Sequence, residues 1–421
     1  MRLCLVASKP TDSVIFGFLP AAARLGLEVV LLTDQPEAHE RARALARTLP
    51  RPGCLPPPPG TGAADAPVRL LGCDVWDFRA LIGAIAGLPT PDAIVSNSDH
   101  LQAQTALAAG FFGLAGKDWR SALRAKNKSL MRARLAETGA EHVAAAEIRP
   151  GHPLPALCYP VVLKPAEGVA SEDVMLVSGP EELAGRSAEV FARRPGERLL
   201  AEEYLPGELH TLETIGDGTA TWVLGGFRTR VSPLPYFIEE RLTWDAPVPA
   251  AAAAHVLAAL GGLGGTFGPG HTEYVDGRRG PTLIEVNDRL IGDHCDFVLS
   301  DLLGLDLFEL VLRVYLGEPL PPQPPPGPWG AGGHAVIDYV IADRPGVLVA
   351  TPPAGPQSTG AAGVALSYRP LRAAGDRVEI THTNRDYLGV ISAVGADPAA
   401  VELAVTALRA AGNWEIVERE P

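Results

Sequence analysis

The first hundred residues alternate between short apolar runs and amphipathic segments. The apolar runs predict strands at residues 2–8, 27–34 and 92–99, and the segments between and after them predict helices at 13–25, 35–47 and 99–109. This alternation is typical of a doubly wound parallel sheet, so we expect an α/β domain over residues 1–117. A loop rich in proline runs from Pro50 to Pro67. No GxGxxG follows any of these strands, which argues against a dinucleotide site.

The pattern changes near residue 118 and predicts a second domain over residues 118–318. Helices are expected at 118–138, 180–193, 250–262 and 300–316, and strands at 160–164, 174–178, 198–204, 208–215 and 237–240. Within this domain, residues 160–207 form a small lid subdomain. A proline-rich connector follows at 319–330. Residues 331–421 predict a small C-terminal α/β lobe, with strands at 334–342, 363–368, 376–382 and 387–395 and a helix at 397–411.

Composition restricts the class of protein. A chain of 421 residues is too long for one ordinary core, which favours two or three domains. The 36 basic against 49 acidic residues give a net charge of −13, and no basic patch stands out, so no nucleic-acid partner is expected. Five widely spaced cysteines without a CxxC pair indicate reduced thiols in the cytoplasm. The apolar start is too short for a signal peptide, and the uncharged stretch 246–271 is too rich in Ala and Gly for a membrane span.

Lysine is scarce in this chain, because arginine supplies almost every cation. A bias of this kind should leave lysine mainly where a compact ammonium works and a planar guanidinium does not. The lysines therefore merit individual attention: Lys9, Lys117, Lys126, Lys128 and Lys164.

A hairpin at residues 271–288 carries the clearest candidate site. The strand HTEYV holds Glu273, the strand LIEVND holds Glu285 and Asn287, and DGRRG forms the turn. Strand periodicity places Glu285 and Asn287 on one face, and Glu273 can lie close to them. Two carboxylates and an amide oxygen suit Mg²⁺ shared with phosphate oxygens. The alternative is a solvent-facing acidic hairpin.

Two further hairpins carry weaker signals. In residues 159–177, Lys164 ends an apolar strand before a loop with Gly168 and Ser171, which is a possible phosphate clamp or an ordinary hairpin with an edge lysine. In residues 199–215, the backbone at Glu202 to Leu205 could pair with an adenine edge while Glu208 accepts from ribose hydroxyls. A surface hairpin would look the same.

Taken in order, these segments resemble the ATP-grasp superfamily of carboxylate-amine ligases along the whole chain. The segments are AKNKSLMRARLAETG, VVLKPAEG, AEEYLPGE, GPGHTEY and LIEVNDRLIGDH, and PYFIEE is similar to a segment of the L-amino-acid ligase and secondary-metabolite (siderophore-type) amide ligase branch. The resemblance implies an N-terminal α/β domain, a central nucleotide-grasping domain of two small sheets and a C-terminal lobe.

The resemblance also implies roles for individual residues. Lys128 and Lys164 would contact phosphates, beside a phosphate loop with Gly168 and Ser171. The adenine hinge would be Glu202, Glu203, Tyr204 and Leu205, with Glu208 on the ribose. The metal ligands would be Glu273, Glu285 and Asn287, and Arg289 would stabilise the acyl-phosphate and tetrahedral intermediates. Candidates for recognising the polar ends of the substrates are Arg228, Arg230, Glu239, His271 and His294.

The implied cofactors are ATP and Mg²⁺, as two ions that Mn²⁺ could replace, and the implied activity is amide formation between small amino-acid or polycarboxylate metabolites. A homodimer is expected by analogy only. Carboxylases of the biotin-carboxylase or purine-pathway kind and a catalytically silent nucleotide-binding regulator are the alternatives. Two departures stand out from the family pattern: residues 167–173 contain few glycines, and Asp288 stands between Asn287 and Arg289.

Overall fold

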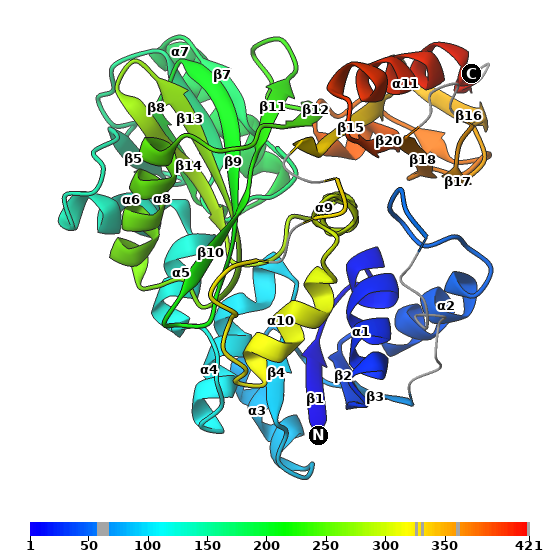
Figure 1. Cartoon of the computed structure of the whole chain (residues 1–421). Coiled ribbons are helices and arrows are strands. Elements are labelled where there is room, and N and C mark those ends of the chain that lie inside the picture. Colours follow the sequence, from blue (N-terminus) through cyan, green and yellow to red (C-terminus); the bar gives the residue numbers. More distant parts are fainter. Residues whose placement is uncertain (57–66, 325–326, 330–331, 359–362, 419–421) are drawn as a thin grey trace.

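The N-terminal part forms a four-stranded parallel sheet, as the alternation predicts (Figure 1). The computed structural model describes residues 1–56, 67–324, 327–329, 332–358 and 363–418, so residues 57–66 of the predicted proline-rich loop lie outside it. The strand order is β3-β2-β1-β4, with β1 at Arg2–Val6, β2 at Glu28–Thr33, β3 at Val68–Gly72 and β4 at Ala93–Val95. The helical segments are η1 (Ser13–Phe18), α1 (Leu19–Arg24), α2 (Pro36–Ala46), α3 (Phe78–Ala86), η2 (Asp99–Leu101) and α4 (Gln102–Phe111).

The predicted helix over 118–138 is two helices. α5 (Trp119–Lys126) ends at Asn127, and α6 (Lys128–Glu137) begins directly after it. Asn127 has an extended backbone (φ −98°, ψ 105°), and its side-chain oxygen accepts a hydrogen bond of 3.0 Å from the amide of Leu130. An asparagine in this position caps the second helix, which makes the break stable and places Lys128 at a helix start.

Two antiparallel sheets follow. The smaller has the order β5-β8-β6-β7 and packs against α7 (Pro180–Arg193); its strands are Ala145–Ile148, Leu199–Glu203, Val161–Pro165 and Met175–Val177 in that order. The larger begins with β14 (Gly280–Asn287), β13 (Gly268–Gly277), β9 (Gly207–Gly216), β11 (Phe227–Val231) and β12 (Glu239–Trp244), with β10 (Thr221–Gly225) paired to β9. α8 (Ala250–Leu263) covers β13 and β14.

The larger sheet does not stop at the predicted domain boundary. β12 pairs with β15 (His334–Ile341), in the register Arg241 with Asp338, and the sheet continues through β20 (Tyr387–Gly395), β18 (Val364–Pro370) and β17 (Gly355–Pro356). The resemblance implied two small sheets and a separate lobe, but the structure joins the second sheet and the lobe into ten strands. Residues 325–326 and 330 of the predicted connector lie outside the described residues.

The predicted helix over 300–316 is also two helices, α9 (Cys295–Leu303) and α10 (Leu307–Tyr315). Gly304 ends α9 in the left-handed conformation (φ 65°), and the carboxylate of Asp306 caps α10 by accepting from the amide of Glu309. A glycine in this conformation is a common helix stop. α10 packs on α1 and β4, so it attaches the later part of the chain to the N-terminal sheet.

The C-terminal lobe is completed by a three-stranded sheet and one helix. The sheet comprises β19 (Arg377–Val378), β16 (Gly346–Ala350) and β21 (Glu415–Val417), and α11 (Pro398–Ala411) packs on β15 and β20. In the described part of the chain, no helix combines the length and the apolar character needed to cross a bilayer.

Candidate active site

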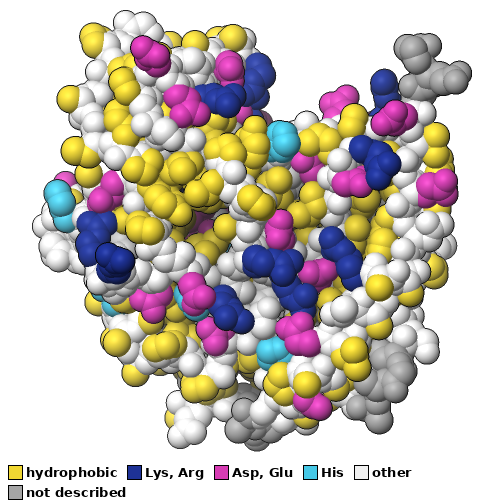
Figure 2. Space-filling model, turned by 90° about the horizontal axis from the view of Figure 1, so that it is seen from above, with side chains coloured by type: hydrophobic (Ala, Val, Ile, Leu, Met, Phe, Trp, Pro, Cys, Tyr) yellow, Lys and Arg dark blue, Asp and Glu magenta, His cyan; other side chains and the backbone are white. Residues whose placement is uncertain are grey.

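A cavity of about 790 Å³ opens where the three parts of the chain meet. Its walls come from the loops after β1 and β4, from β6 and β8, from the hairpin of β13 and β14, and from the C-terminal lobe at Tyr339, Leu371 and Asn384. Figure 2 shows a face that is hollowed, with hydrophobic side chains around the depression and charged side chains to one side. The volume is in the range of small-molecule sites.

Lys128 connects two of these walls. Its buried ammonium donates to Oε1 of Glu285 at 2.9 Å and to the carbonyl oxygen of Gly168 at 3.3 Å. Burial alone would lower the pKa of Lys128, but the carboxylate of Glu285 outweighs burial and raises it. One buried cation therefore contacts both the loop after β6 and the hairpin of β13 and β14, which carries the predicted metal ligands.

Lys164 and Arg132 share the carboxylate of Glu202. Lys164 contacts Oε1 of Glu202, and Nε of Arg132 donates to Oε2 at 2.9 Å; all three side chains are buried. Burial raises the pKa of Glu202, but the two cations outweigh it and lower this pKa to about 2. Glu141 lies 3.5 Å from Nη1 of Arg132, so the buried cluster holds two cations against two carboxylates, and of these residues Lys164 and Glu202 line the cavity.

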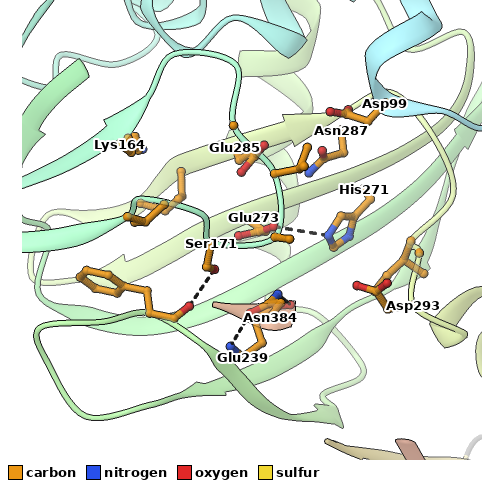
Figure 3. Close-up of a pocket in the computed structure, with 18 of the residues that line it drawn as sticks. Asp99, Lys164, Ser171, Glu239, His271, Glu273, Glu285, Asn287, Asp293 and Asn384 are labelled. Atoms are coloured by element: carbon orange, nitrogen blue, oxygen red, sulfur yellow. Dashed lines mark hydrogen bonds and ion pairs between the residues drawn. The ribbon is translucent and has the colours of Figure 1, made fainter. Parts of the chain in front are cut away.

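The hairpin brings the three predicted metal ligands onto one face. Glu273 lies directly opposite Glu285 in the register of β13 and β14, and Asn287 lies opposite His271 (Figure 3). Nδ1 of His271 lies 2.8 Å from Glu213, and Nε2 lies 3.6 Å from Glu273. Burial lowers the pKa of His271, but these carboxylates outweigh burial and raise it to about 10, so His271 is charged at neutral pH.

The donor set of the hairpin fits a hard divalent cation. Like charges directly opposite each other on a sheet are unfavourable, so Glu273 and Glu285 favour a cation between them. Lys128 contacts Oε1 of Glu285, and His271 lies near Oε1 of Glu273, so each carboxylate keeps a second oxygen without an ion-pair partner among the described residues. Among the described residues, no three His, Cys, Asp or Glu side chains form a metal-binding group, and the amide oxygen of Asn287 is the third predicted donor beside the two carboxylates.

The glycine-poor loop adopts its shape through non-glycine residues. Ala170, Ser171 and Asp173 have positive φ of 56°, 54° and 56°. Oγ of Ser171 donates to the carbonyl of Phe237 at 2.9 Å, and the amide of Asn384 donates to the carbonyl of Ala170 at 3.1 Å. Such backbone strain persists only where the surroundings hold it, and it is frequent at functional sites.

The acidic residues of this loop point away from the cavity. Asp173 lies 2.6 Å from Nη2 of Arg193, and Glu172 lies 2.9 Å from Nη2 of Arg194. Neither carboxylate lines the cavity. Both carboxylates are therefore held by arginines at the end of α7, outside the cavity.

Comparisons with known proteins agree on the fold. No protein-family model matches the sequence. The protein y4rH of Sinorhizobium fredii, described as uncharacterized, is 25% identical over 335 residues; the match covers 76% of this chain and 64% of y4rH, so the chain spans just under two thirds of that relative. The L-amino acid ligase of Bacillus licheniformis superposes with a TM-score of 0.75 at 20% identity, covering 100% of this chain and 99% of the ligase.

Two more solved structures share this fold. The phosphoribosylglycinamide synthetase of Anaerococcus prevotii superposes with a TM-score of 0.68 at 12% identity, covering 99% of both chains. The N5-carboxyaminoimidazole synthetase of Staphylococcus aureus, solved with ADP, gives 0.63 at 12% identity, covering 97% of this chain and 96% of that one. All three solved proteins are ATP-grasp enzymes. This chain has the ATP-grasp fold.

In this ATP-grasp chain, Arg289 faces the cavity immediately after the hairpin. Its amide donates to the carbonyl of Asn287 at 2.8 Å, which forms a tight turn, and its Nη1 donates to the carbonyl of Leu290 at 2.9 Å. Among the described residues, its guanidinium makes no ion pair with a carboxylate. Asp288 points to the other side, toward Lys117, so it does not read a substrate from inside the cavity.

The residues predicted to bind the adenine and the ribose lie in different places. The hinge residues line the cavity, namely Glu202, Glu203, Tyr204 and Leu205. Glu208 is exposed and does not line it; its carboxylate lies 3.7 Å from Nε2 of His210. The structure therefore gives no support to a ribose contact by Glu208.

The predicted substrate residues separate into two groups. Glu239, His271 and His294 line the cavity. Arg228 and Arg230 are exposed outside it, and Nε of Arg230 lies 3.0 Å from Glu240. Both arginines lie on the solvent-facing side of β11, an inner strand of the larger sheet, so their predicted role finds no support in the geometry.

Several cavity residues were given no role from sequence, although Lys9 was singled out among the scarce lysines. They come mostly from the loops after β1 and β4 and from the C-terminal lobe, namely Lys9, Asp12, Trp76, Asp99, His100, Asp293, Tyr339 and Asn384. The residues in the loops after β1 and β4 could have been expected at a binding site. Ligands of open α/β sheets bind beyond the carboxyl ends of the strands, at the point where the strand order reverses. No local signal marks Asn384, which reaches the cavity only through the tertiary fold.

Proposed function

We propose that this protein is an ATP-dependent carboxylate-amine ligase that forms an amide bond and releases ADP and phosphate. The observation that carries the proposal is the position of Lys128. Its ammonium contacts Gly168, in the loop predicted to bind phosphate, and Glu285, in the hairpin that carries the predicted metal ligands. A phosphate held at that ammonium would lie between the loop and the hairpin. This is the arrangement that phosphoryl transfer between a nucleotide and a bound acid requires.

The nucleotide would occupy the end of the cavity formed by the smaller antiparallel sheet, β5-β8-β6-β7. The backbone between Glu203 and Leu205 would bind the adenine edge, and Lys128 and Lys164 would contact phosphate oxygens. Lys164 is charge-paired to Glu202 and therefore held in place before any ligand arrives. Fixed cations of this kind stabilise transferring phosphate without reorganisation at the moment of reaction.

Glu273, Glu285 and Asn287 would hold Mg²⁺. The metal, when bound, neutralises phosphate charge and orients the phosphate oxygens. The chain's own part is to present two facing carboxylates and an amide oxygen on a rigid hairpin. The protonated ring of His271 would hold the neighbouring Glu273 carboxylate in place by charge attraction.

The acyl end of the site would be centred on Arg289. The substrate carboxylate attacks the γ-phosphate, and the acyl phosphate formed is then attacked by an amine, which expels phosphate. Arg289, with no carboxylate partner among the described residues, can bind the acyl-phosphate oxygens and the oxyanion that forms on amine attack. No side-chain nucleophile is needed for this sequence.

A phosphate-release screen tests the proposal. Purified protein with ATP and Mg²⁺ is offered pairs of small carboxylates and amines, including pairs of amino acids and hydroxy-polycarboxylates with amines, and products are identified by mass. The proposal expects phosphate release that depends on both partners and a product with the mass of the amide. Phosphate release that depends on bicarbonate and needs no second amine would instead identify a carboxylase, and no release with any pair would favour a nucleotide-binding regulator.

A further inference from the structure

The cavity extends past the proposed nucleotide and metal residues to the carboxyl ends of β1 and β4. Residues of the two loops there line it, namely Ala7, Ser8, Lys9, Thr11, Asn97, Ser98 and His100, and Trp76 adds to the same wall. β1 and β4 are neighbours in the order β3-β2-β1-β4, so the strand order reverses between them, and the cavity reaches the loops that follow these two strands. None of these residues has a role in the proposed handling of ATP or metal.

Among the described residues that form this wall, one positive charge has no ion-pair partner. Of the lysines that line the cavity, Lys128 and Lys164 are paired with Glu285 and Glu202. Lys9 is exposed, and its side-chain ammonium makes no hydrogen bond or ion pair to any other described residue.

The acidic residues of the same wall are already neutralised. Asp99 is ion-paired to Lys126, and the carboxylate of Asp12 lies 2.9 Å from Nε2 of His294 and 2.7 Å from Nη2 of Arg369. The wall therefore favours a ligand with an anionic group near Lys9.

Trp76 gives the wall a flat apolar surface. Its side chain is 47% exposed although it lies at a cavity, and its Nε1 donates to Oδ2 of Asp34 at 3.1 Å, which fixes the indole by its polar edge. The ring of His100 lies 5.7 Å from the indole, inclined by 45°. Burial lowers the pKa of His100, so at neutral pH this ring is uncharged. Two uncharged rings beside each other suit a planar or apolar body.

We propose that this crevice binds the amine substrate, and that this amine carries an acidic group, which pairs with Lys9, and a flat apolar body, which packs on Trp76 and His100. The inference rests on the proposed ligase function. The other substrate must place its carboxylate beside Lys128 and Arg289 to be phosphorylated, so the crevice is left for the nucleophile. Attack from the N-terminal wall is also possible without displacing the nucleotide, because that wall holds no proposed ATP residue.

Calorimetry with three probes tests this assignment in the presence of MgADP: L-tryptophan has the acid and the ring, tryptamine has the ring alone, and glycine has the acid alone. We expect L-tryptophan to bind the wild-type protein at least about tenfold more tightly than either other probe. Lys9→Met should weaken L-tryptophan about tenfold and leave tryptamine unchanged. Trp76→Ala should weaken both about tenfold, whereas Trp76→Phe, which keeps a flat ring, should stay within about threefold of wild type.

Two matched controls lie outside the cavity on exposed side chains, Arg79→Met and Trp119→Ala, and both should bind all three probes as the wild-type protein does. The assignment is overturned if L-tryptophan binds no better than tryptamine and glycine, or if Lys9→Met and Trp76→Ala leave its affinity unchanged. A failure of the proposed ligase function would be a separate result. It would appear in the phosphate-release screen, as no release that depends on an amine, and would not depend on the affinities measured for the three probes.

Discussion

The ammonium of Lys117 lies 3.7 Å from Oδ1 of Asp288; the two side chains are 6% and 14% exposed, and neither residue lines the cavity. The same ammonium donates to the carbonyls of Phe267 at 2.6 Å and Pro269 at 3.0 Å. Lys117 therefore attaches to the beginning of β13 and to the end of β14. Through Asp288 it fixes the turn between the proposed metal ligand Asn287 and Arg289.

This pairing predicts a large loss of stability in Lys117→Met. The substitution leaves the carboxylate of Asp288 buried without a partner, which costs about 3 to 5 kcal/mol. Urea unfolding followed by circular dichroism measures it, and the double variant Lys117→Met with Asp288→Leu should recover part of the loss. Lys9→Met is the matched control, because Lys9 is exposed and should change the free energy of unfolding by less than about 0.5 kcal/mol. Equal losses in the free energy of unfolding for the two lysine variants would contradict a stabilising contact between Lys117 and Asp288.

Glu202 predicts a specific dependence of stability on pH. Its pKa is lowered from 4.5 to about 2 in the folded protein, so its contribution is complete above the unfolded pKa of 4.5 and is lost as pH falls toward 2. Between pH 6 and pH 3 the wild-type protein should lose about 2 kcal/mol more than Glu202→Gln does. Urea unfolding at a series of pH values gives the two slopes. Parallel slopes would show that Glu202 is not charge-paired in the folded state.

Glu285→Gln should raise the Mg²⁺ concentration needed for half-maximal phosphate release by at least about tenfold, because an amide is a weaker ligand than a carboxylate for a hard cation. Titration of Mg²⁺ at saturating ATP measures the change. Glu189→Gln, on the exposed face of α7, is the control and should leave the titration unchanged. An unchanged titration for Glu285→Gln would remove this residue from the metal site.

Arg289→Lys separates ligation from nucleotide binding. The lysine keeps the positive charge but loses the planar, forked geometry, so ATP affinity should change little while amide formation falls by about 100-fold. Calorimetry with ATP and mass analysis of the amide decide between the two effects. Weakened ATP binding with an unchanged yield of amide per ATP would make Arg289 a nucleotide ligand and leave the proposed acyl site without its main cation.

Local patterns explain why much of the fold was predictable. The parallel N-terminal sheet and the hairpin of Glu273 and Glu285 follow from periodicity over short stretches of chain. The two helix breaks were missed because single residues decide them. Asn127 and Gly304 are both tolerated inside helical patterns, and only the cap geometry shows that the helices end there.

The candidate site was predictable where one segment carries it and not where distant segments meet. Lys164 and Gly168 belong to one strand and its loop, but the contact of Lys128 with Glu285 spans 157 positions. Glu202 was expected to act through its backbone, and its buried carboxylate proved to organise Lys164 and Arg132. Trp76 and Asn384 reach the cavity from opposite ends of the chain, and no pattern within their own segments indicates this.

The pairing of β12 with β15 means that the C-terminal lobe is not an independent module. A chain cut within residues 319–330 would leave each fragment with a bare antiparallel edge, Glu239–Trp244 on one and His334–Ile341 on the other. Unprotected edges of this kind recruit any available strand. The two fragments should therefore be recovered as one complementing pair when produced together, and as aggregates when produced apart.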